Sequence, residues 1–406
     1  MKILDQAKIF INYISKEILS INLVLLFLVF IILSQIILFL LRDRNYIRAI
    51  KKYKDPEVIS IDRLKKLPLI NIIIPAWQEG KEFYDCLLSI TKLTYPHLKV
   101  IVNAGGNEET IQIAESFKKF ESFTILRQTE GRHKAALGKI KALNECLDYV
   151  SEGILYLIDA DCYLTDEILL RMIFPIINEN EKVVVGGGIR PLKSQEQFSL
   201  ARYLEFNRNI FFRIKFNRYI PNLVGGAITC MTYDVIRTIG KFNENRKFAE
   251  DISRGIDITS KGYKIYFLND ARSKLYSDFP ITIKEYFKQR IRYNENRLII
   301  EHHYGNKLYF IKVIILSFIS LFIVLTPIII FINLILFLFG LLCVFYVYLV
   351  KIRKFIFFKI TLNKVDYLKF NTLIFIKMIF YIYIEILSNI FSIFTLLNIK
   401  KKLVET

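Results

Sequence analysis

Three long apolar stretches divide the chain, and a region of ordinary polarity separates the first from the second. They cover residues 18–41, 308–350 and 370–397. A run of about 20 apolar residues is long enough to span a hydrocarbon core of about 30 Å. The pattern therefore predicts a soluble domain attached to membrane-spanning helices.

The first stretch carries no charged residue, and no small-residue cleavage site follows it. Instead, a basic flank begins directly after it, with Arg42, Arg44, Arg48 and Lys51. Basic residues gather on the cytoplasmic side of membrane helices. We therefore expect a retained transmembrane helix, with the following domain in the cytoplasm at the plasma membrane.

The second stretch is too long for a single crossing, because about 43 residues at 1.5 Å each would reach about 65 Å. Two helices that meet near Pro327 or Asn333 fit better, which gives four spans in all. This count places the basic residues 400–402 outside, against the positive-inside tendency. The C-terminal topology therefore stays open.

Residues 69–305 alternate short β-branched runs with helical patterns. Strands are expected at 69–74, 99–102, 123–126, 154–158, 183–185 and 264–268. Strands separated by helices predict an α/β fold with a mostly parallel sheet covered on both faces. Ligands of such sheets bind at the carboxyl ends of the strands, so the chemistry should follow each apolar run.

These observations give an expected organisation along the chain. It comprises a tail (1–17), a transmembrane helix (18–41), a basic linker (42–68), the catalytic domain (69–280), an amphipathic interfacial segment (281–305), two transmembrane helices (306–350), a basic loop (351–369), a transmembrane helix (370–398) and a tail (399–406).

Composition narrows the class of protein. The formal net charge is +19 and the mean hydropathy is +0.35. No basic helix carries a nucleic-acid recognition motif, so the positive charge fits cytoplasmic membrane flanks and not a nucleic-acid partner. The five cysteines are odd in number and contain no C-x-x-C pair, so neither a disulfide framework nor a zinc site is indicated.

Two carboxylates, Asp159 and Asp161, follow the apolar run 154–158. Alternation along a strand would place both on the same side of the chain. They have no cation nearby in the sequence, so they would repel each other unless a divalent cation lay between them, and oxygen ligands suit Mg²⁺ or Mn²⁺. The alternative is that one of them caps a helix starting near Asp166.

A second acidic pair, Glu250 and Asp251, opens a predicted helix. The functional interpretation is a general base that removes a hydroxyl proton. Acids at a helix N-terminus are also favoured by the helix dipole, so simple capping is the alternative.

Two further elements carry basic side chains. Gln289, Arg290, Arg292 and Tyr293 lie on a segment whose neighbouring apolar residues are expected to rest on the bilayer while the arginines face inward to a phosphate. The alternative is that the arginines bind lipid headgroups. Lys139, in a Gly-Lys pair that opens a predicted helix, is a weaker candidate for a phosphate contact.

In this order and spacing, the motifs resemble the membrane-integrated, inverting family 2 glycosyltransferases of the GT-A fold. That branch includes poly-N-acetylglucosamine, hyaluronan, chitin and cellulose synthases and ceramide glucosyltransferases. The resemblance implies a Rossmann-like catalytic domain and transfer of a sugar from a nucleotide-sugar donor, expected to be a UDP-sugar, to a glycan or lipid acceptor at the inner membrane face. It also implies the following roles: donor binding by Pro75, Trp77, Glu79, Asn103, Lys139 and Asp159; metal binding by Asp161 and Asp159; catalysis by Asp251 with Glu250; and acceptor or diphosphate binding by Gln289, Arg290, Arg292 and Tyr293.

Two positions depart from the family pattern. Asn103 stands where the family carries an aspartate after its second strand, and Tyr293 stands where a tryptophan closes the Q-x-x-R-W element. The first weakens the expectation of a UDP donor, and the second leaves processivity open, because tyrosine stacks on a sugar with less area.

The leading hypothesis is an enzyme of envelope or extracellular polysaccharide synthesis. A single-transfer glycolipid synthase is the alternative, because four spans leave a monomer little room for a polar channel. A non-catalytic assembly subunit is a further alternative, which the intact acidic pairs oppose. The sequence leaves the sugar, the linkage and the oligomeric state open.

Overall fold

The computed structural model places most of the catalytic region and the C-terminal helices. The residues it describes are 57–128, 135–187, 218–220, 227–244, 250–268, 272–276, 280, 282–303, 307–329, 331, 333–362 and 372–397, with isolated positions between 26 and 44. The predicted tails, 1–17 and 399–406, lie outside these residues, as does half of the first apolar stretch.

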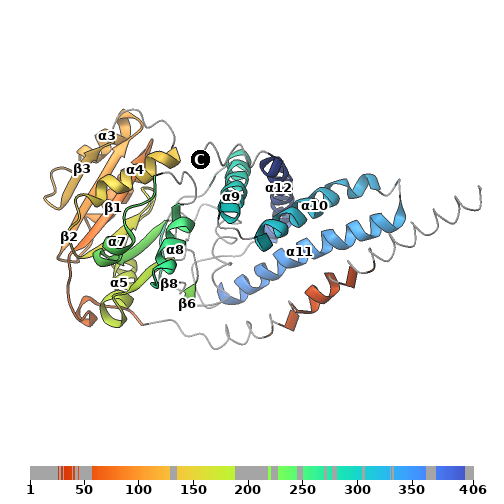
Figure 1. Cartoon of the computed structure of the whole chain (residues 1–406), viewed down its shortest axis with the longest axis horizontal. Helices are drawn as coiled ribbons and strands as arrows, with labels where there is room; N and C mark the ends of the chain where they lie inside the picture. The colour runs from red at the N-terminus through yellow and green to blue at the C-terminus, as the bar shows by residue number, and fades with distance from the viewer. Residues whose placement is uncertain are drawn as a thin grey trace, which may run out of the picture.

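An eight-stranded sheet forms the centre of the first region, in the order β3-β2-β1-β4-β7-β5-β8-β6 (Figure 1). Its strands are β1 (Ile70–Trp77), β2 (Leu98–Gly105), β3 (Phe123–Arg127), β4 (Ile154–Ile158), β5 (Val183–Gly187), β6 (Arg218–Ile220), β7 (Ile228–Thr232) and β8 (Lys264–Leu268). All six predicted strands are present, and the predicted mostly parallel α/β sheet is confirmed. Parallel pairs join β1 to β2, β1 to β4, β2 to β3 and β5 to β8.

The sequence analysis missed β6 and β7, which supply the antiparallel pairings. β7 lies between β4 and β5 and runs antiparallel to both, and β6 pairs with β8. The carboxyl end of β4 therefore lies beside the beginning of β7. This position matters because Asp159 follows β4 directly, and its backbone N–H donates to the carbonyl of Ala227 at 3.1 Å.

Helices cover both faces of the sheet, which is why the strands are nearly continuous apolar runs. The helices of this region are α2 (Lys81–Ile90), α3 (Glu108–Glu115), α4 (Ala135–Leu147), α5 (Asp166–Phe174), α7 (Tyr233–Ile239) and α8 (Glu250–Ser260), with single turns η1 (Ile61–Arg63) and η2 (Pro175–Glu179). Ile72 and Ile74 join the core cluster on one face, and Ile73 joins the cluster that includes Leu143 of α4 and Ile258 of α8. The sheet thus supports α4 and α8 on the same face.

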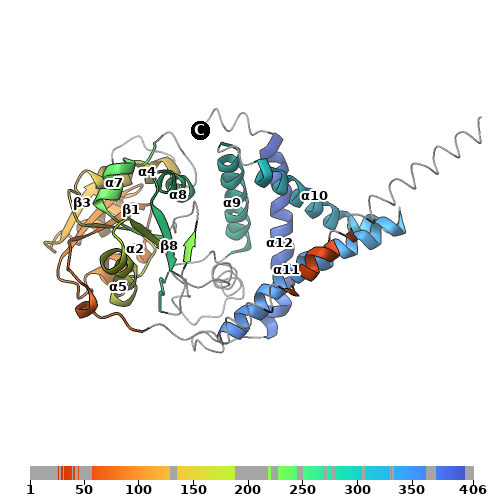
Figure 2. The same cartoon turned by 60° about the horizontal axis from the view of Figure 1, so that its bottom comes forward.

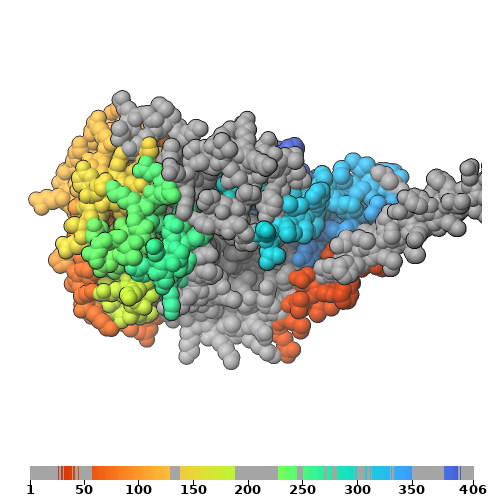
Figure 3. All heavy atoms as spheres, in the orientation of Figure 1, coloured from red at the N-terminus to blue at the C-terminus, as the bar shows by residue number. Residues whose placement is uncertain are grey.

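Four long helices follow the sheet region: α9 (Ile283–His303), α10 (Lys307–Ile329), α11 (Leu334–Leu362) and α12 (Thr372–Leu397). α9 and α10 both pack against α12, and α10 also packs against α11. In both ribbon views α9 stands between the sheet region and α10–α12 (Figures 1 and 2). Helices α10 and α11 extend away from the sheet region as an arm (Figure 3).

Two expectations about this helical region need correction. The segment 351–362 was expected in a basic loop but continues α11. Its Lys and Arg residues are good helix formers, and no Pro or Gly interrupts the segment. Tyr286 and Phe287 belong to the apolar residues expected to rest on the bilayer, but Tyr286 is buried inside the protein and Phe287 is half-buried against α12. Tyr286 is 0% exposed, and the ring of Phe287 lies 5.4 Å from that of Phe391 on α12.

The structure also bears on the four predicted membrane spans. Within the part of the chain that the structure describes, no helix combines the length and the apolarity needed to cross a membrane.

Candidate active site

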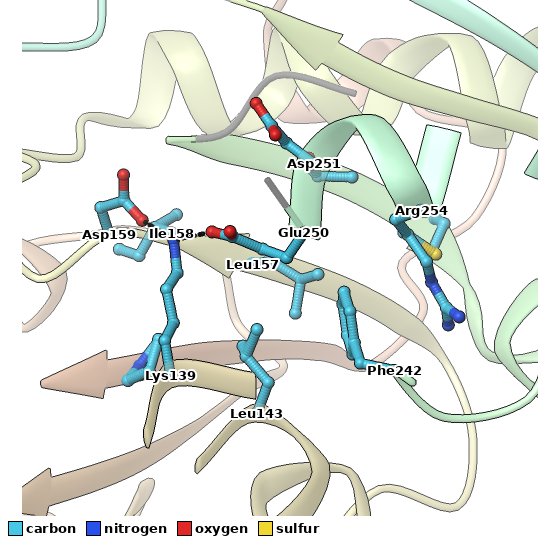
Figure 4. A pocket seen from close by; sticks show the side chains of 12 residues that line it. Lys139, Leu143, Leu157, Ile158, Asp159, Phe242, Glu250, Asp251 and Arg254 are labelled. Carbon is cyan, nitrogen blue, oxygen red and sulfur yellow. Dashed lines mark hydrogen bonds and ion pairs between the residues drawn. The ribbon is translucent and has the colours of Figure 1, made fainter. Parts of the chain in front are cut away.

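One pocket lies over the carboxyl end of β4, between α4 and α8. Its polar lining residues are Lys139, Asp159, Thr229, Glu250, Asp251 and Arg254, and its remaining lining residues are Pro75, Leu143, Leu157, Ile158, Met231 and Phe242 (Figure 4). Five of the predicted site residues, Pro75, Lys139, Asp159, Glu250 and Asp251, therefore meet at one place.

Lys139 joins the two acidic motifs. Its Nζ donates to Asp159 Oδ1 at 2.8 Å and lies 2.6 Å from Glu250 Oε1. Figure 4 shows the ammonium group between the two carboxylates. Burial acts to lower the pKa of Lys139, but the carboxylates of Asp159 and Glu250 outweigh it and raise that pKa well above its ordinary value. The lysine is therefore a fixed positive charge, with 29% of its side chain still exposed.

The neighbouring acids Glu250 and Asp251 are in different electrostatic states. The charge of Lys139 lowers the pKa of Glu250, and Arg292 on α9 adds to this effect. Burial raises the pKa of Asp251 to about 6, and the negative charge of Glu250 adds to the rise. Two adjacent acids with separated pKa values are typical of a site that divides an ionic role from a proton-transfer role.

The backbone N–H of Ile252 donates a hydrogen bond to Asp251 Oδ1 at 2.8 Å. In Figure 4 its carboxylate does not point toward Lys139, whereas that of Glu250 does. A carboxylate of pKa about 6 that is not held by an ion pair to this lysine suits proton abstraction near neutral pH.

Asp161 lies two residues beyond Asp159 but does not line this pocket. Strand β4 ends at Ile158, and a turn follows in which the N–H of Cys162 donates to the carbonyl of Asp159 at 3.2 Å. Strand alternation therefore does not relate the two aspartates, contrary to the expectation from their spacing.

The turn after β4 is also the predicted metal site. Among the residues that the structure describes, no group of three or more His, Cys, Asp or Glu side chains could hold a metal ion. Mg²⁺ is commonly bound by one or two carboxylates together with substrate phosphates. Asp159 and Asp161 fit that arrangement, in which the remaining oxygen ligands come from a bound diphosphate and water.

The predicted donor loop lies beside the pocket. Trp77 ends β1, and Gln78 after it has a φ of 53°. Gly106, with a φ of 91°, lets the β2 loop come close: an added Cβ would lie 2.8 Å from Gln78 N and 2.8 Å from Trp77 Cδ2. The backbone of Glu79 is bonded through both its N–H and its carbonyl to Thr110 Oγ1, at 2.7 and 2.8 Å.

Asn103, a predicted donor contact, instead ties the sheet to α4. Its side chain is 0% exposed, and Nδ2 donates to Glu145 Oε2 at 2.6 Å and to the carbonyl of Ala142 at 3.3 Å. It does not line the pocket. The position expected to read the base therefore has a packing role in this structure.

The predicted diphosphate element lies on α9. The Arg290 guanidinium carbon is 4.8 Å from the ring centre of Tyr293 and 5.4 Å from that of Tyr286, and one Arg290 Nη donates to Gln289 Oε1 at 3.5 Å. None of these residues lines the pocket, but Arg292 is near enough to lower the pKa of Glu250. α9 thus presents positive charge toward the acidic pair.

The sequence analysis missed several pocket residues. Arg254 lies one helical turn after Glu250, is 3% exposed, and donates to the carbonyl of Gly240 at 2.7 Å while its guanidinium carbon lies 4.4 Å from the Phe242 ring centre. Burial lowers its pKa to about 10. The helical spacing from Glu250 was the available signal for Arg254, whereas nothing in the sequence pointed to Met231 or Phe242.

Comparison with known proteins bears on this arrangement. The sequence profile of the family "Glycosyltransferase like family 2" matches residues 68–296, which is more than half of the chain. The chain belongs to this family. The match includes β1, the Asp159 turn, the Glu250–Asp251 pair and most of α9. The predicted membership of glycosyltransferase family 2 is therefore confirmed, whereas the membrane-integrated, inverting branch stays a prediction.

Individual relatives share about a quarter of their aligned residues with this chain. Glycosyltransferase AglE of Haloferax volcanii is 25% identical over 208 residues, covering 50% of this chain and 66% of that protein. The poly-beta-1,6-N-acetyl-D-glucosamine synthase of Staphylococcus epidermidis is 24% identical over 228 residues, covering 55% and 53%. The chain thus spans about half to two thirds of the length of these curated relatives.

Among solved structures, the mannosyltransferase PcManGT from Pyrobaculum calidifontis, in complex with GDP-Man and Mn²⁺, aligns with a TM-score of 0.46. The identity is 17%, and the alignment covers 66% of this chain and 72% of that structure.

Proposed function

We propose that the chain is an active, inverting glycosyltransferase that moves a sugar from a nucleotide-sugar donor to a glycan or lipid acceptor at the membrane. The observation that carries this proposal is the separation of roles between two adjacent acids. Glu250 is paired with Lys139, whereas Asp251 has a pKa raised to about 6. Membership of the family supports the reaction class.

In the proposed reaction, Asp251 accepts the proton of an acceptor hydroxyl as its oxygen attacks the anomeric carbon of the donor. The new carbon–oxygen bond forms as the bond from the anomeric carbon to the diphosphate oxygen breaks. A single displacement inverts the configuration at that carbon. The leaving diphosphate gains negative charge, and positive groups fixed in advance stabilise such charge. Lys139, Arg290 and Arg292 are the groups assigned to this task.

We propose Asp159 and Asp161 as the residues that hold Mg²⁺ or Mn²⁺ together with the donor phosphates. The ion would supply charge stabilisation for the leaving diphosphate. The proposal rests on two carboxylates that lie two residues apart in the turn after β4, and on Lys139 beside one of them.

Asp161→Ala should therefore abolish the dependence of donor binding on the metal. We expect UDP to bind the wild type at least about tenfold more tightly with Mn²⁺ than with EDTA, and the variant to show no such difference, because a ligand is missing. Calorimetry on detergent-purified protein measures both affinities. Asp166→Ala, a change in the first turn of α5, is the matched control. An unchanged metal effect in Asp161→Ala would remove this residue from the metal site.

The rate should rise with pH through the pKa of Asp251. The base must be ionised to accept a proton, so kcat/KM should fall about tenfold per pH unit below about 6. Glu250→Gln should shift this fall in kcat/KM to lower pH, because the charge of Glu250 is one cause of the raised pKa of Asp251. Initial rates between pH 4.5 and 8 test both statements. If kcat/KM falls at the same pH in Glu250→Gln as in the wild type, Asp251 is not the titrating base.

We further propose that the catalytic region works on the cytoplasmic side of the plasma membrane, with α10–α12 against membrane lipids. Large apolar side chains on these helices and at the α10–α11 turn support this, among them Leu308 at 80% exposure and Phe331 at 90%. The basic residues after the first apolar stretch favour the cytoplasmic side. Retention in membranes after a high-salt wash and release by detergent are the expected results.

Radiolabelled nucleotide sugars and isolated membranes test the function as a whole. A panel of UDP- and GDP-sugars with Mg²⁺ and Mn²⁺ identifies the donor. High-mass aqueous product indicates a polysaccharide, in line with the named activity of the Staphylococcus epidermidis relative. Organic-extractable product indicates a single transfer to lipid. No transfer and no donor hydrolysis with any donor would overturn the proposal.

A further inference from the structure

A line of buried and half-buried polar side chains joins α9 to α10 and α12, and we call it the polar seam. Its members are Tyr286, Asn294, Ser317, Ser320, Glu385 and Asn389. The Asn294 amide donates to Asn389 Oδ1 at 3.2 Å, and the Asn389 amide donates to Ser320 Oγ at 3.3 Å. These hydrogen bonds link α9 to α12 and α12 to α10, so the seam helps to fix how α9 sits on the other two.

Glu385 is the charged member of the seam and the only acidic residue of α12. It is 8% exposed, and it accepts a hydrogen bond from the hydroxyl of Tyr286, which is 0% exposed. A carboxylate in such surroundings is costly unless hydrogen-bonded. Replacing it by an apolar residue of similar size costs little when a site has only a packing role, so its presence calls for a further explanation.

Tyr286 connects this carboxylate to the proposed diphosphate element. Its ring also lies against Arg290, whose guanidinium carbon is 5.4 Å from the ring centre. Tyr293 lies on the same guanidinium at 4.8 Å. The two rings therefore hold the guanidinium group by cation–π contacts, and the buried Nε–H of Arg290 has no acceptor among the described residues.

We propose that Glu385 is a positioning residue for Arg290: by holding the hydroxyl of Tyr286, it fixes the ring against which the guanidinium is oriented toward the donor diphosphate. This inference rests on the proposed glycosyl transfer. It assigns a function in turnover to a residue of α12, a helix that lines no part of the pocket. Because an oriented arginine matters most when charge develops on the leaving group, the effect should appear in kcat and little in KM.

Two single variants and their combination test the proposal on the detergent-purified full chain. Glu385→Leu removes the acceptor, and Tyr286→Phe removes the donor but keeps the ring. Each should lower kcat about tenfold with the donor KM within about twofold. The double variant should be no slower than the slower single variant, because both changes break the same hydrogen bond. Glu385→Gln keeps an acceptor oxygen and should retain at least about a third of kcat.

Tyr383→Phe, at an exposed tyrosine of the same helix, is the control and should leave kcat unchanged. Thermal unfolding of each variant checks folding, and Tyr286→Phe carries the test if Glu385→Leu fails to fold. Wild-type rates in both single variants, losses that multiply in the double variant, or a loss confined to KM would overturn the positioning role while leaving the proposed function intact. An inactive wild type would overturn both.

Discussion

Replacing Asp251 by asparagine should lower the rate of sugar transfer by about a thousandfold while leaving donor binding within about threefold of the wild type. General-base catalysis contributes about 10²–10⁴-fold, and an amide cannot accept the acceptor's proton. The proposed donor contacts, Lys139 and Asp159, should stay in place because they are held by the Lys139 pairs to Asp159 and Glu250 and not by Asp251. Transfer from radiolabelled donor and calorimetric donor binding measure the two quantities separately.

The stability of this variant discriminates a catalytic role from a structural one. The pKa of Asp251 is raised to about 6 from an ordinary value of 3.8, so the folded protein disfavours the ionised form, and at neutral pH this group opposes folding. Asp251→Asn should therefore melt at the same temperature as the wild type or higher, as is common when a strained functional group is removed. A large fall in Tm would identify Asp251 as a structural residue instead.

Asp234→Asn provides the matched control, because it makes the same change in the first turn of α7, where the side chain is exposed. It should keep wild-type transfer. Donor hydrolysis that persists equally in Asp251→Asn and in the wild type would refute the assigned base. A wild type that never turns over donor would support the assembly-subunit alternative.

The strands of the sheet were predictable because each is a local run of apolar residues. Runs such as 154–158 and 264–268 carry their own signal, and their observed bounds agree with it. The strand β7 is different: it is a five-residue segment of mixed polarity, Ile228–Thr232, buried because it inserts between β4 and β5. That insertion depends on contacts with segments far away in the chain, which no local pattern encodes.

The site residues were predictable as motifs but not as partners. Lys139 was singled out as a phosphate contact, yet the ion pairs to Asp159 and Glu250 depend on α4 and α8 sharing one face of the sheet. The contacts of Asn103 were likewise not predictable, because its register opposite Pro75 places the side chain under α4, and its role in donor binding stays a prediction. Spacing indicated which residues carry chemistry, whereas packing decided which of them meet.

The helical region shows the same division. The apolar pattern indicated helices after residue 305, but it assigned Tyr286 and Phe287 to a lipid surface. The burial of Tyr286 and the contact of Phe287 with Phe391 follow from the match between α9 and α12, a helix about a hundred residues later. Periodicity shows that a face is apolar and leaves open what covers it.

Replacing Lys139 by methionine should lower kcat/KM by about a hundredfold and weaken donor binding about tenfold. The variant loses the one cation that lies between Asp159 and Glu250, so their carboxylates repel each other and the incoming diphosphate. An oriented cation beside a leaving diphosphate stabilises the transition state more than the bound substrate, which is why the rate should fall further than the affinity. Steady-state kinetics and calorimetry with UDP measure the two losses.

Lys141→Met removes the same charge from the same helix two residues later and is the matched control for long-range electrostatics. The two variants should also differ in the pH dependence of their stability. Because the pKa of Glu250 is lowered in the folded protein, its ion pair stabilises the fold at pH values above 4.5, the ordinary pKa of a glutamate. This stabilisation is lost as the pH falls through the folded-state pKa of Glu250. Lys139 stays charged over the same pH range, because its pKa is raised. The Tm deficit of Lys139→Met, corresponding to about 1–3 kcal/mol at neutral pH, should therefore shrink only as the pH falls below 4.5. A deficit that is independent of pH would mean that Lys139 acts through packing of its aliphatic chain, and the electrostatic basis assigned to the pocket would then be wrong.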